Sequence, residues 1–287
     1  MRRDAPPGPL IQAAARALGE GPRHTLDLAR EVLGLSGNPG AASAAVFALL
    51  GADRRFEVDG QGCWTLVGPA PGTPLSRLRY AVVDVETTGG PYASGHRITE
   101  VAVYEVHRGE VGEGFRTLIN PGRPIPPRVA ALTGIRDAMV ADAPFFEDVA
   151  ETLRERLEGR VFVAHNVRFD WGFVSRQFAD ATGDVPRVER LCTVRMARHL
   201  VPGLRRRNLD ALARHFGVEI PARHRAWGDA LATARVFLRL LDEAERAGVA
   251  DLDALRALLR RRPRRSRPRQ GQQLSLLAGE GTGEESE

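Results

Sequence analysis

The chain has 287 residues, of which 43% are hydrophobic, so it can bury one full-sized core and a smaller second one. The formal net charge is +5, and all 41 basic residues are arginine, which excludes a P-loop lysine, a Schiff base and a Ser–Lys mechanism. Two cysteines, Cys63 and Cys192, are too few for a cysteine-based zinc site, and the absence of a signal peptide or a membrane-length apolar run predicts a cytoplasmic protein with no membrane partner.

Residues 1–67 are predicted to form a small α+β domain with the layout of a winged helix. Three short helices with apolar faces are expected, at Pro9–Leu18, Thr25–Leu33 and Ala41–Leu50. Thr25 is a plausible N-cap of the second. A hairpin should follow over residues 54–67, with Asp59–Gly60 at its turn.

The third predicted helix carries little basic charge. Ala42, Ala44 and Ala45 stand where a DNA-reading helix would present Arg or Asn. This favours a protein-docking or structural role for the domain, with DNA binding as the alternative. Residues 68–77, rich in Pro and Gly, read as a linker.

The remaining elements predict an α/β domain over residues 78–245, a mixed sheet with flanking helices. Strands are expected at Tyr80–Glu86, Ile98–His107 and Gly112–Asn120, as an antiparallel meander, and at Val161–Ala164. Helices are expected near Ile125–Leu132, Phe145–Leu157, Trp171–Phe178, Asn208–Phe216 and Ala226–Leu241. A last helix within residues 246–262, about Asp251–Arg261, either caps this domain or spaces the tail.

Two carboxylates lie near the end of the first of these strands. Asp84 and Glu86 are two residues apart, so they project from the same face. Burying an unpaired carboxylate among valines is costly, and a second one beside it adds to the cost. No basic residue lies within the strand. A divalent cation bound by both is the simplest remedy.

Two further segments carry chemistry. Asp170 lies near the start of a helix that follows the strand at Val161, and His224 lies at the mouth of the helix that contains Asp229 one turn further on. Singly, these are an ordinary helix cap and a surface histidine. The order and spacing of all three segments instead predict a two-metal nuclease. Oxygen ligands favour Mg²⁺ or Mn²⁺.

These segments resemble the DnaQ-like DEDDh 3′–5′ exonucleases, a family that includes the proofreading subunit of bacterial replicative polymerases. The family's Asp-x-Glu-Thr-Thr-Gly is matched by residues 84–89 and its His-Asn-x-x-Phe-Asp by residues 165–170. Its final His, four residues and Asp are matched by His224 and Asp229. Gly90 departs from the pattern, since a bulkier apolar residue commonly follows the first motif.

The resemblance implies an RNase H-like fold and a role for each motif residue. Asp84 would bridge both metals, Glu86 and Asp229 would lie on the nucleophile side, and Asp170 would lie nearer the second metal. His224 would be the general base that takes a proton from the attacking water, a task that suits an imidazole at neutral pH.

Weaker assignments concern the substrate. Thr88 and Gly89 are expected to offer backbone contacts to the 3′-terminal nucleotide, and Asn166 to help position the substrate. The run Arg205–Arg207 either lines the path of single-stranded substrate or is a solvated loop.

Residues 263–287 are predicted to form a disordered tail. Residues 260–269 include seven arginines, so the excess positive charge of the chain is concentrated there. This run is expected to contact phosphates, and a solubilising linker is the alternative. Residues 273–277 resemble the short peptide with which bacterial polymerases and repair proteins bind the DNA sliding clamp. The expected partner-binding residues are Gln273, Leu274, Leu276 and Leu277.

The sequence therefore predicts a metal-dependent exonuclease that shortens single-stranded or frayed DNA 3′ ends to nucleoside 5′-monophosphates. Proofreading or repair beside a clamp-bound DNA polymerase is the expected setting. Three alternatives remain open. They are an RNA 3′–5′ exonuclease, a non-catalytic DNA- or clamp-binding adaptor, and a winged-helix transcription regulator.

Overall fold

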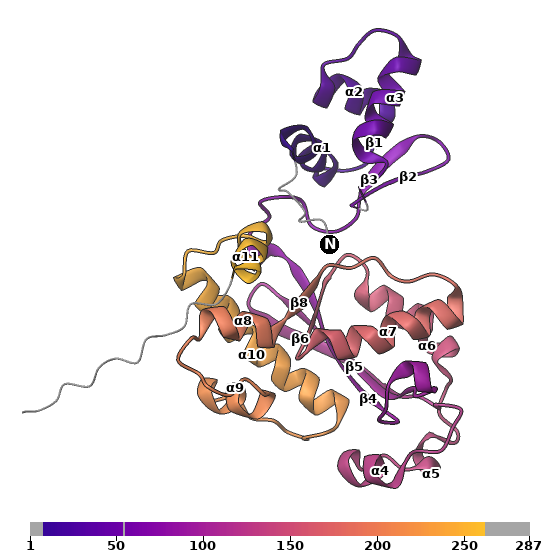
Figure 1. Ribbon diagram of the computed structural model, residues 1–287, viewed down its shortest axis with the longest axis vertical. Coiled ribbons are helices and arrows are strands. Elements are labelled where there is room, and N and C mark those ends of the chain that lie inside the picture. The colour runs from indigo at the N-terminus through magenta and orange to yellow at the C-terminus, as the bar shows by residue number, and fades with distance from the viewer. Residues whose placement is uncertain (1–7, 54, 262–287) are drawn as a thin grey trace, which may run out of the picture.

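A computed structural model describes residues 8–53 and 55–261 and shows a small N-terminal unit above a larger α/β unit (Figure 1). The small unit contains α1 (Pro9–Gly19), β1 (Arg23–His24), α2 (Thr25–Leu33), α3 (Pro39–Leu50), β2 (Phe56–Val58) and β3 (Cys63–Leu66). The three expected helices and the hairpin are present. The two-residue strand β1 was not predicted, and it completes a sheet of order β1-β3-β2.

The predicted N-cap of α2 was wrong. His24 caps this helix, its Nδ1 accepting a hydrogen bond from the backbone N–H of Leu26. The hydroxyl of Thr25 is occupied elsewhere, because it donates to the carbonyl of Gly62 and accepts from the indole N–H of Trp64. Thr25 therefore ties α2 to the hairpin across the core of the small unit.

The segment before the larger sheet packs against the C-terminal end of the described chain. The 3-10 turn η1 (Leu75–Arg77) begins with a hydrogen bond from the amide of Leu75 to the carbonyl of Ala250. Leu75 and Leu78 are buried in the same core cluster as Leu255 of the last helix. The last helix therefore caps the larger unit, which is one of the two roles predicted for it; the other was to space the tail.

The larger unit is built on a mixed sheet, as predicted, which has five strands. Its strands are β4 (Arg79–Thr87), β5 (Ile98–His107), β6 (Glu110–Leu118), β7 (Val161–Ala164) and β8 (Arg190–Cys192), in the order β6-β5-β4-β7-β8. Strands β4, β5 and β6 form the expected antiparallel meander, whereas β7 runs parallel to β4 and β8 parallel to β7. Strand β4 is therefore central and paired on both sides.

Helices cover both faces of this sheet (Figure 1). They are α4 (Pro127–Thr133), α5 (Asp137–Val140), α6 (Phe146–Leu157), α7 (Val167–Thr182), α8 (Thr193–Leu200), α9 (Leu209–Phe216), α10 (Ala226–Arg246) and α11 (Leu252–Arg260), with a 3-10 turn η2 (Tyr92–Ser94). Strand β8 and helices α5 and α8 were not predicted. Helix α7 begins four residues before the predicted Trp171, and α10 continues beyond Leu241 to Arg246.

The alternation of side chains along β4 decides where its carboxylates point. Tyr80 and Val82 pack into the core cluster that contains residues of α10, whereas Val83 and Val85 pack into the cluster that contains residues of α6 and α7. Because side chains two residues apart share a face, the alternation continues through Asp84 to the α10 side of the sheet. The apolar pattern thus aims the acidic end of the strand at one helix.

Among the described residues, no helix combines the length and apolar character needed to span a membrane. The thiols of Cys63 and Cys192 are both free. The predicted tail, residues 263–287 with the clamp-like peptide at 273–277, lies outside the described residues.

Candidate active site

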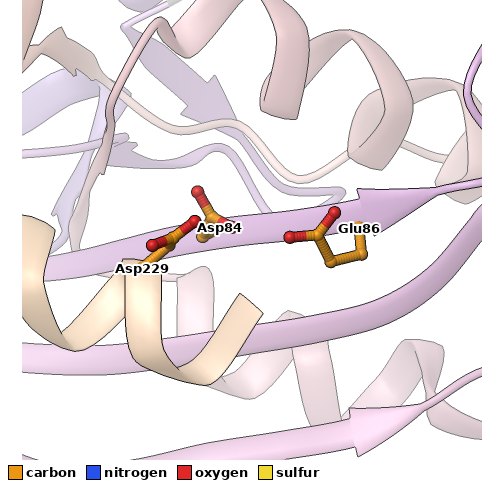
Figure 2. A group of neighbouring side chains, drawn as sticks. All are labelled: Asp84, Glu86 and Asp229. Atoms are coloured by element: carbon orange, nitrogen blue, oxygen red, sulfur yellow. The ribbon is translucent and has the colours of Figure 1, made fainter. Parts of the chain in front are cut away.

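Three carboxylates from two distant parts of the chain meet where β4 ends beside α10. Asp84 and Glu86 project from the strand and Asp229 from the first turn of the helix (Figure 2). One carboxylate oxygen from each lies within 4.8 Å of the other two. The structure therefore brings together three of the four carboxylates that the sequence predicted as metal ligands.

The fourth carboxylate, Asp170, lies next to this group. Asn166 adopts a left-handed conformation with φ of 73° and turns the chain from β7 into α7, which places Asp170 in the first turn of that helix. Its Oδ1 accepts a hydrogen bond from the backbone N–H of Val85, 3.3 Å away. Its Oδ2 is buried and has no hydrogen-bond partner within the described part of the chain.

The four carboxyl groups are hard to ionise together. Burial, with the neighbouring charges of Asp170, Asp229 and Glu86, raises the pKa of Asp84 well above its usual value. Burial likewise raises the pKa of Glu86 to about 7 and that of Asp170 to about 8. The pKa of Asp229 is raised by burial, although the nearby Arg223 lowers it. A cation that neutralises the group would favour ionisation of all four.

Backbone geometry ties the predicted base to a predicted ligand. His224 is half-buried and has a left-handed φ of 59°, a conformation that non-glycine residues adopt infrequently. Its backbone N–H donates to Oδ2 of Asp229 at 3.2 Å. The fold thus fixes the peptide of His224 against the acidic cluster.

The entry to α10 is anchored to the sheet by an ion pair that the sequence reasoning missed. Glu100, buried on β5, receives two hydrogen bonds from the guanidinium of Arg225, at 2.8 and 3.0 Å. It also accepts from the backbone N–H of Ala226, the first residue of the helix, at 2.9 Å. A carboxylate at this point satisfies a free amide and suits the positive end of the helix dipole.

A second arginine was missed as well. Arg223 contacts Oδ2 of Asp229 and also pairs with Asp210 of α9. The local signals were a glutamate inside the apolar strand Ile98–His107 and two arginines that flank His224. Sequence alone could not pair them, because each partner lies on a different element.

The predicted substrate-binding residues lie at the rim of the site. Thr88 is buried, and its amide donates to the carbonyl of Arg97 at 2.9 Å. The amide of Gly89, with φ of 110°, donates to the hydroxyl of Thr87 at 3.1 Å. Both amides are thus used within the protein. Asn166 is exposed at the start of α7.

Gly90, the departure from the family pattern, has a local reason. A Cβ at this position would lie 2.3 Å from Nε2 of His96. The ring of His96 is itself held by Thr88, whose hydroxyl is 2.9 Å and whose carbonyl is 3.0 Å from its Nδ1. A histidine ring therefore occupies the space that a side chain at position 90 would need.

The donor set fits divalent metal ions. It consists of carboxylate oxygens, the ligands that Mg²⁺ and Mn²⁺ prefer. One oxygen each of Asp170 and Asp229 is buried without a hydrogen-bond partner among the described residues, although such atoms ordinarily have one. These orphaned oxygens, close to a cluster of raised pKa values, point to a cation as the missing partner.

An RNase H-like mixed sheet with such an acidic group at its centre defines a nuclease fold, and comparison with known proteins gives the family. Residues 81–237 match the RNase_T family, described as Exonuclease. The chain belongs to this exonuclease family.

Two relatives and one solved structure illustrate the similarity. The chain is 36% identical over 184 residues to the 3′–5′ exonuclease DinG of Bacillus subtilis. The matched region is 64% of this chain and 20% of DinG. It is 34% identical over 180 residues to the DNA polymerase III subunit epsilon of Aquifex aeolicus, covering 62% of this chain and 89% of that one. E. coli Exonuclease I in complex with a dT13 oligonucleotide has a similar fold, with a TM-score of 0.53 and 18% sequence identity. The match covers 60% of this chain and 43% of the Exonuclease I chain.

Several of the relatives are far longer than the region they share with this chain. The shared region is 20% of DinG and 28% of an epsilon-like protein from Rhodobacter capsulatus. The chain therefore corresponds to only part of the length of these relatives.

Proposed function

We propose that this protein is a metal-dependent 3′–5′ exonuclease of the DEDDh type that releases nucleoside 5′-monophosphates from DNA 3′ ends. One observation carries the proposal. Four carboxylates from three separate segments converge at the end of β4 beside α10, and the backbone N–H of His224 donates to one of them. A purely structural role would not require four carboxylates with raised pKa values at one point.

The residues divide the work as follows. Two Mg²⁺ or Mn²⁺ ions would be held by the carboxylates of Asp84, Glu86, Asp170 and Asp229. When bound, these ions would supply charge neutralisation and an activated water. His224, whose peptide is fixed by Asp229, would take the proton from the attacking water as general base.

The rim of the site would hold the substrate. The exposed Gly89 and Asn166 and the backbone of Thr88 are proposed to contact the terminal nucleotide. The amides of Thr88 and Gly89 would have to exchange their present partners to do so. Arg205 and Arg206, exposed before α9, are proposed to follow the phosphates of the incoming strand.

The names of two relatives support the direction and the polymer. One is called a 3′–5′ exonuclease and another a subunit of DNA polymerase III. Proofreading or repair beside a DNA polymerase is the proposed setting. The peptide at Gln273, Leu274, Leu276 and Leu277 would bind a sliding clamp.

The small unit would serve as a winged-helix-like docking module. Its α3 exposes Ala44, Phe47 and Ala48, none of which is charged, and this favours a protein partner over DNA.

The test uses 5′-labelled DNA and RNA oligonucleotides, single-stranded or duplex with a 3′ mismatch, incubated with Mg²⁺, Mn²⁺ or EDTA. We expect DNA to shorten from its 3′ end with either metal and to remain intact in EDTA. Asp84→Asn should lower the rate by at least about a thousandfold, since it removes one of the four carboxylates that would hold the metals. The matched control, Asp180→Asn, removes an exposed carboxylate of α7 and should leave the rate unchanged.

Each other outcome has a definite meaning. Shortening of RNA alone would make the protein an RNA exonuclease. No cleavage of either polymer by a protein that binds Mn²⁺ would refute the enzyme and favour a binding adaptor.

A further inference from the structure

Arg223 lies between two carboxylates on two different helices. Its Nε and Nη2 pair with Asp210 of α9, at 2.9 and 3.4 Å, while its Nη1 contacts Oδ2 of Asp229 at the start of α10. The arginine side chain is about one-third exposed, whereas that of Asp229 is almost fully buried. The guanidinium thus reaches from the surface into the acidic cluster.

The oxygen that Arg223 holds belongs to a carboxylate that a metal would need. Asp229 is one of the three residues whose carboxylate oxygens lie within 4.8 Å of one another. Its Oδ2 already accepts from Arg223 and from the backbone of His224. The positive charge acts beyond this contact, because Arg223 offsets part of the rise in pKa that burial and neighbouring carboxylates impose on Asp84 and Glu86.

We propose that Arg223 is a built-in competitor of the divalent metal, so that its contact with Asp229 sets the metal affinity of the site. Two positive charges on one carboxylate repel each other. A cation held by Oδ1 of Asp229, which has no hydrogen-bond partner among the described residues, would lie beside the guanidinium on Oδ2, and this repulsion weakens its binding. This inference rests on the proposed metal-dependent function.

Asp210 moderates that repulsion. A guanidinium presents five N–H donors in a planar fork, and Nε and Nη2 of Arg223 both donate to Asp210. The carboxylate of Asp210 therefore offsets part of the positive charge that a cation on Asp229 would meet.

The experiment measures Mn²⁺ binding by titration calorimetry on the full chain without nucleic acid, at pH 8 and low salt. Arg223→Gln should bind Mn²⁺ about tenfold more tightly, equivalent to about 1.4 kcal/mol, because the competing charge is gone. Asp210→Asn should bind it more weakly, since the charge of Arg223 is then no longer offset by the carboxylate of Asp210. Arg79→Gln, which removes an arginine paired with Glu105 at the opposite end of β4, is the matched control and should bind like wild type.

The two site variants are predicted to differ in sign, so a general loss of folding cannot imitate the result. Circular dichroism melting of all four proteins verifies that each is folded. Unchanged or weaker binding by Arg223→Gln would overturn the proposal and assign the arginine to orienting Asp229. A wild-type protein that binds no Mn²⁺ would instead refute the metal-dependent nuclease, and this inference with it.

Discussion

Glu86 and Glu100 face each other across strands β4 and β5, yet their charges are balanced in different ways. Glu100 is held by the guanidinium of Arg225 and by a helix amide. Glu86 lies instead among carboxylates, and burial with the nearby charges of Asp229 and Glu100 raises its pKa to about 7. Glu100 is therefore used to hold α10 against the sheet, whereas Glu86 is available to bind a cation.

This difference predicts how stability depends on pH. The raised pKa values of Glu86, about 7, and Asp170, about 8, mean that the folded protein retains protons that the unfolded chain releases near pH 4 to 4.5. Stability in EDTA should therefore fall as the pH rises from about 5 to 8. Urea unfolding at a series of pH values measures this change, and Glu86→Gln should make the decline shallower.

Metal should reverse that trend. Only the ionised carboxylates bind a cation, so the stabilisation by saturating Mg²⁺ should grow over the same pH range. A free energy of unfolding in EDTA that rises between pH 5 and 8 would contradict the raised pKa values.

At the scale of the elements, the position of α10 decides the geometry of the site, because this helix carries Asp229. Gly228 lies in the first turn of α10, directly before Asp229. It packs so closely against the preceding loop that a Cβ would lie 2.2 Å from the carbonyl oxygen of Ala222. Backbone cannot yield as a flexible side chain does. The glycine thus permits α10 to approach the loop that holds Arg223 and His224.

Gly228→Ala should therefore move the helix or the loop. We expect a loss of about 2 kcal/mol in stability and a fall of about a hundredfold in cleavage rate, since a displacement of about 1 Å has that effect on catalytic geometry. Gly172→Ala in α7 is the matched control, because its Cβ would meet only the end of the Arg176 side chain, at 3.9 Å.

The control should be neutral or stabilised by up to about 1 kcal/mol, as helix propensity predicts. Thermal melting and the oligonucleotide assay give both quantities. Equal effects of the two substitutions would show that the close approach at Gly228 is unimportant.

The sequence predicted elements best where a buried strand had clear ends. The strands Ile98–His107 and Val161–Ala164 were predicted with the bounds that the structure shows. The start of α7 was missed because His165, Asn166 and Arg168 are polar and give no apolar helical pattern, whereas Asn166 in a left-handed conformation begins the helix at once. Strand β1 has two residues and leaves no periodic signal.

The acidic cluster was predicted from its motif residues, whereas the arginines beside it were missed. Short local patterns singled out Asp84, Glu86, Asp170 and Asp229, whose carboxylates the structure places near one another. The functional roles of these residues and of His224 stay predictions. The pairing of Arg223 and Arg225 with carboxylates on α9 and β5 depends on how distant elements pack, which no local pattern encodes. The predicted strand Tyr80–Glu86 contains no basic residue, but folding brings Arg223 into contact with Asp229.

At the scale of the whole molecule, the larger unit extends beyond the predicted range of 78–245. Leu75 and Leu78 at one end and Leu252, Leu255 and Leu259 at the other are buried in a single core cluster. The hydroxyl of Tyr80 donates to the carbonyl of Leu75. We therefore expect an independently folding unit of residues 74–260.

Truncation tests these bounds. A chain that begins at residue 73 should melt near the full-length protein and cleave short oligonucleotides at a similar rate, because the contact of the small unit through Glu57 and Arg187 is exposed and contributes little. A chain that begins at residue 79 should lose roughly 4 kcal/mol through the two buried leucines. Equal melting temperatures for the two truncated chains would contradict the extended unit.

Strand β4 and helix α10 lie near opposite ends of the exonuclease sequence, yet each contributes carboxylates to the same cluster (Figure 2). During synthesis the strand leaves the ribosome long before the helix does. A nascent or partly folded chain therefore has no assembled cluster, and it cannot cut nucleic acid until the last part of the fold is in place. Nuclease activity thus reports on completed folding, and a proteolytic cut anywhere between the two elements that lets α10 separate would silence it.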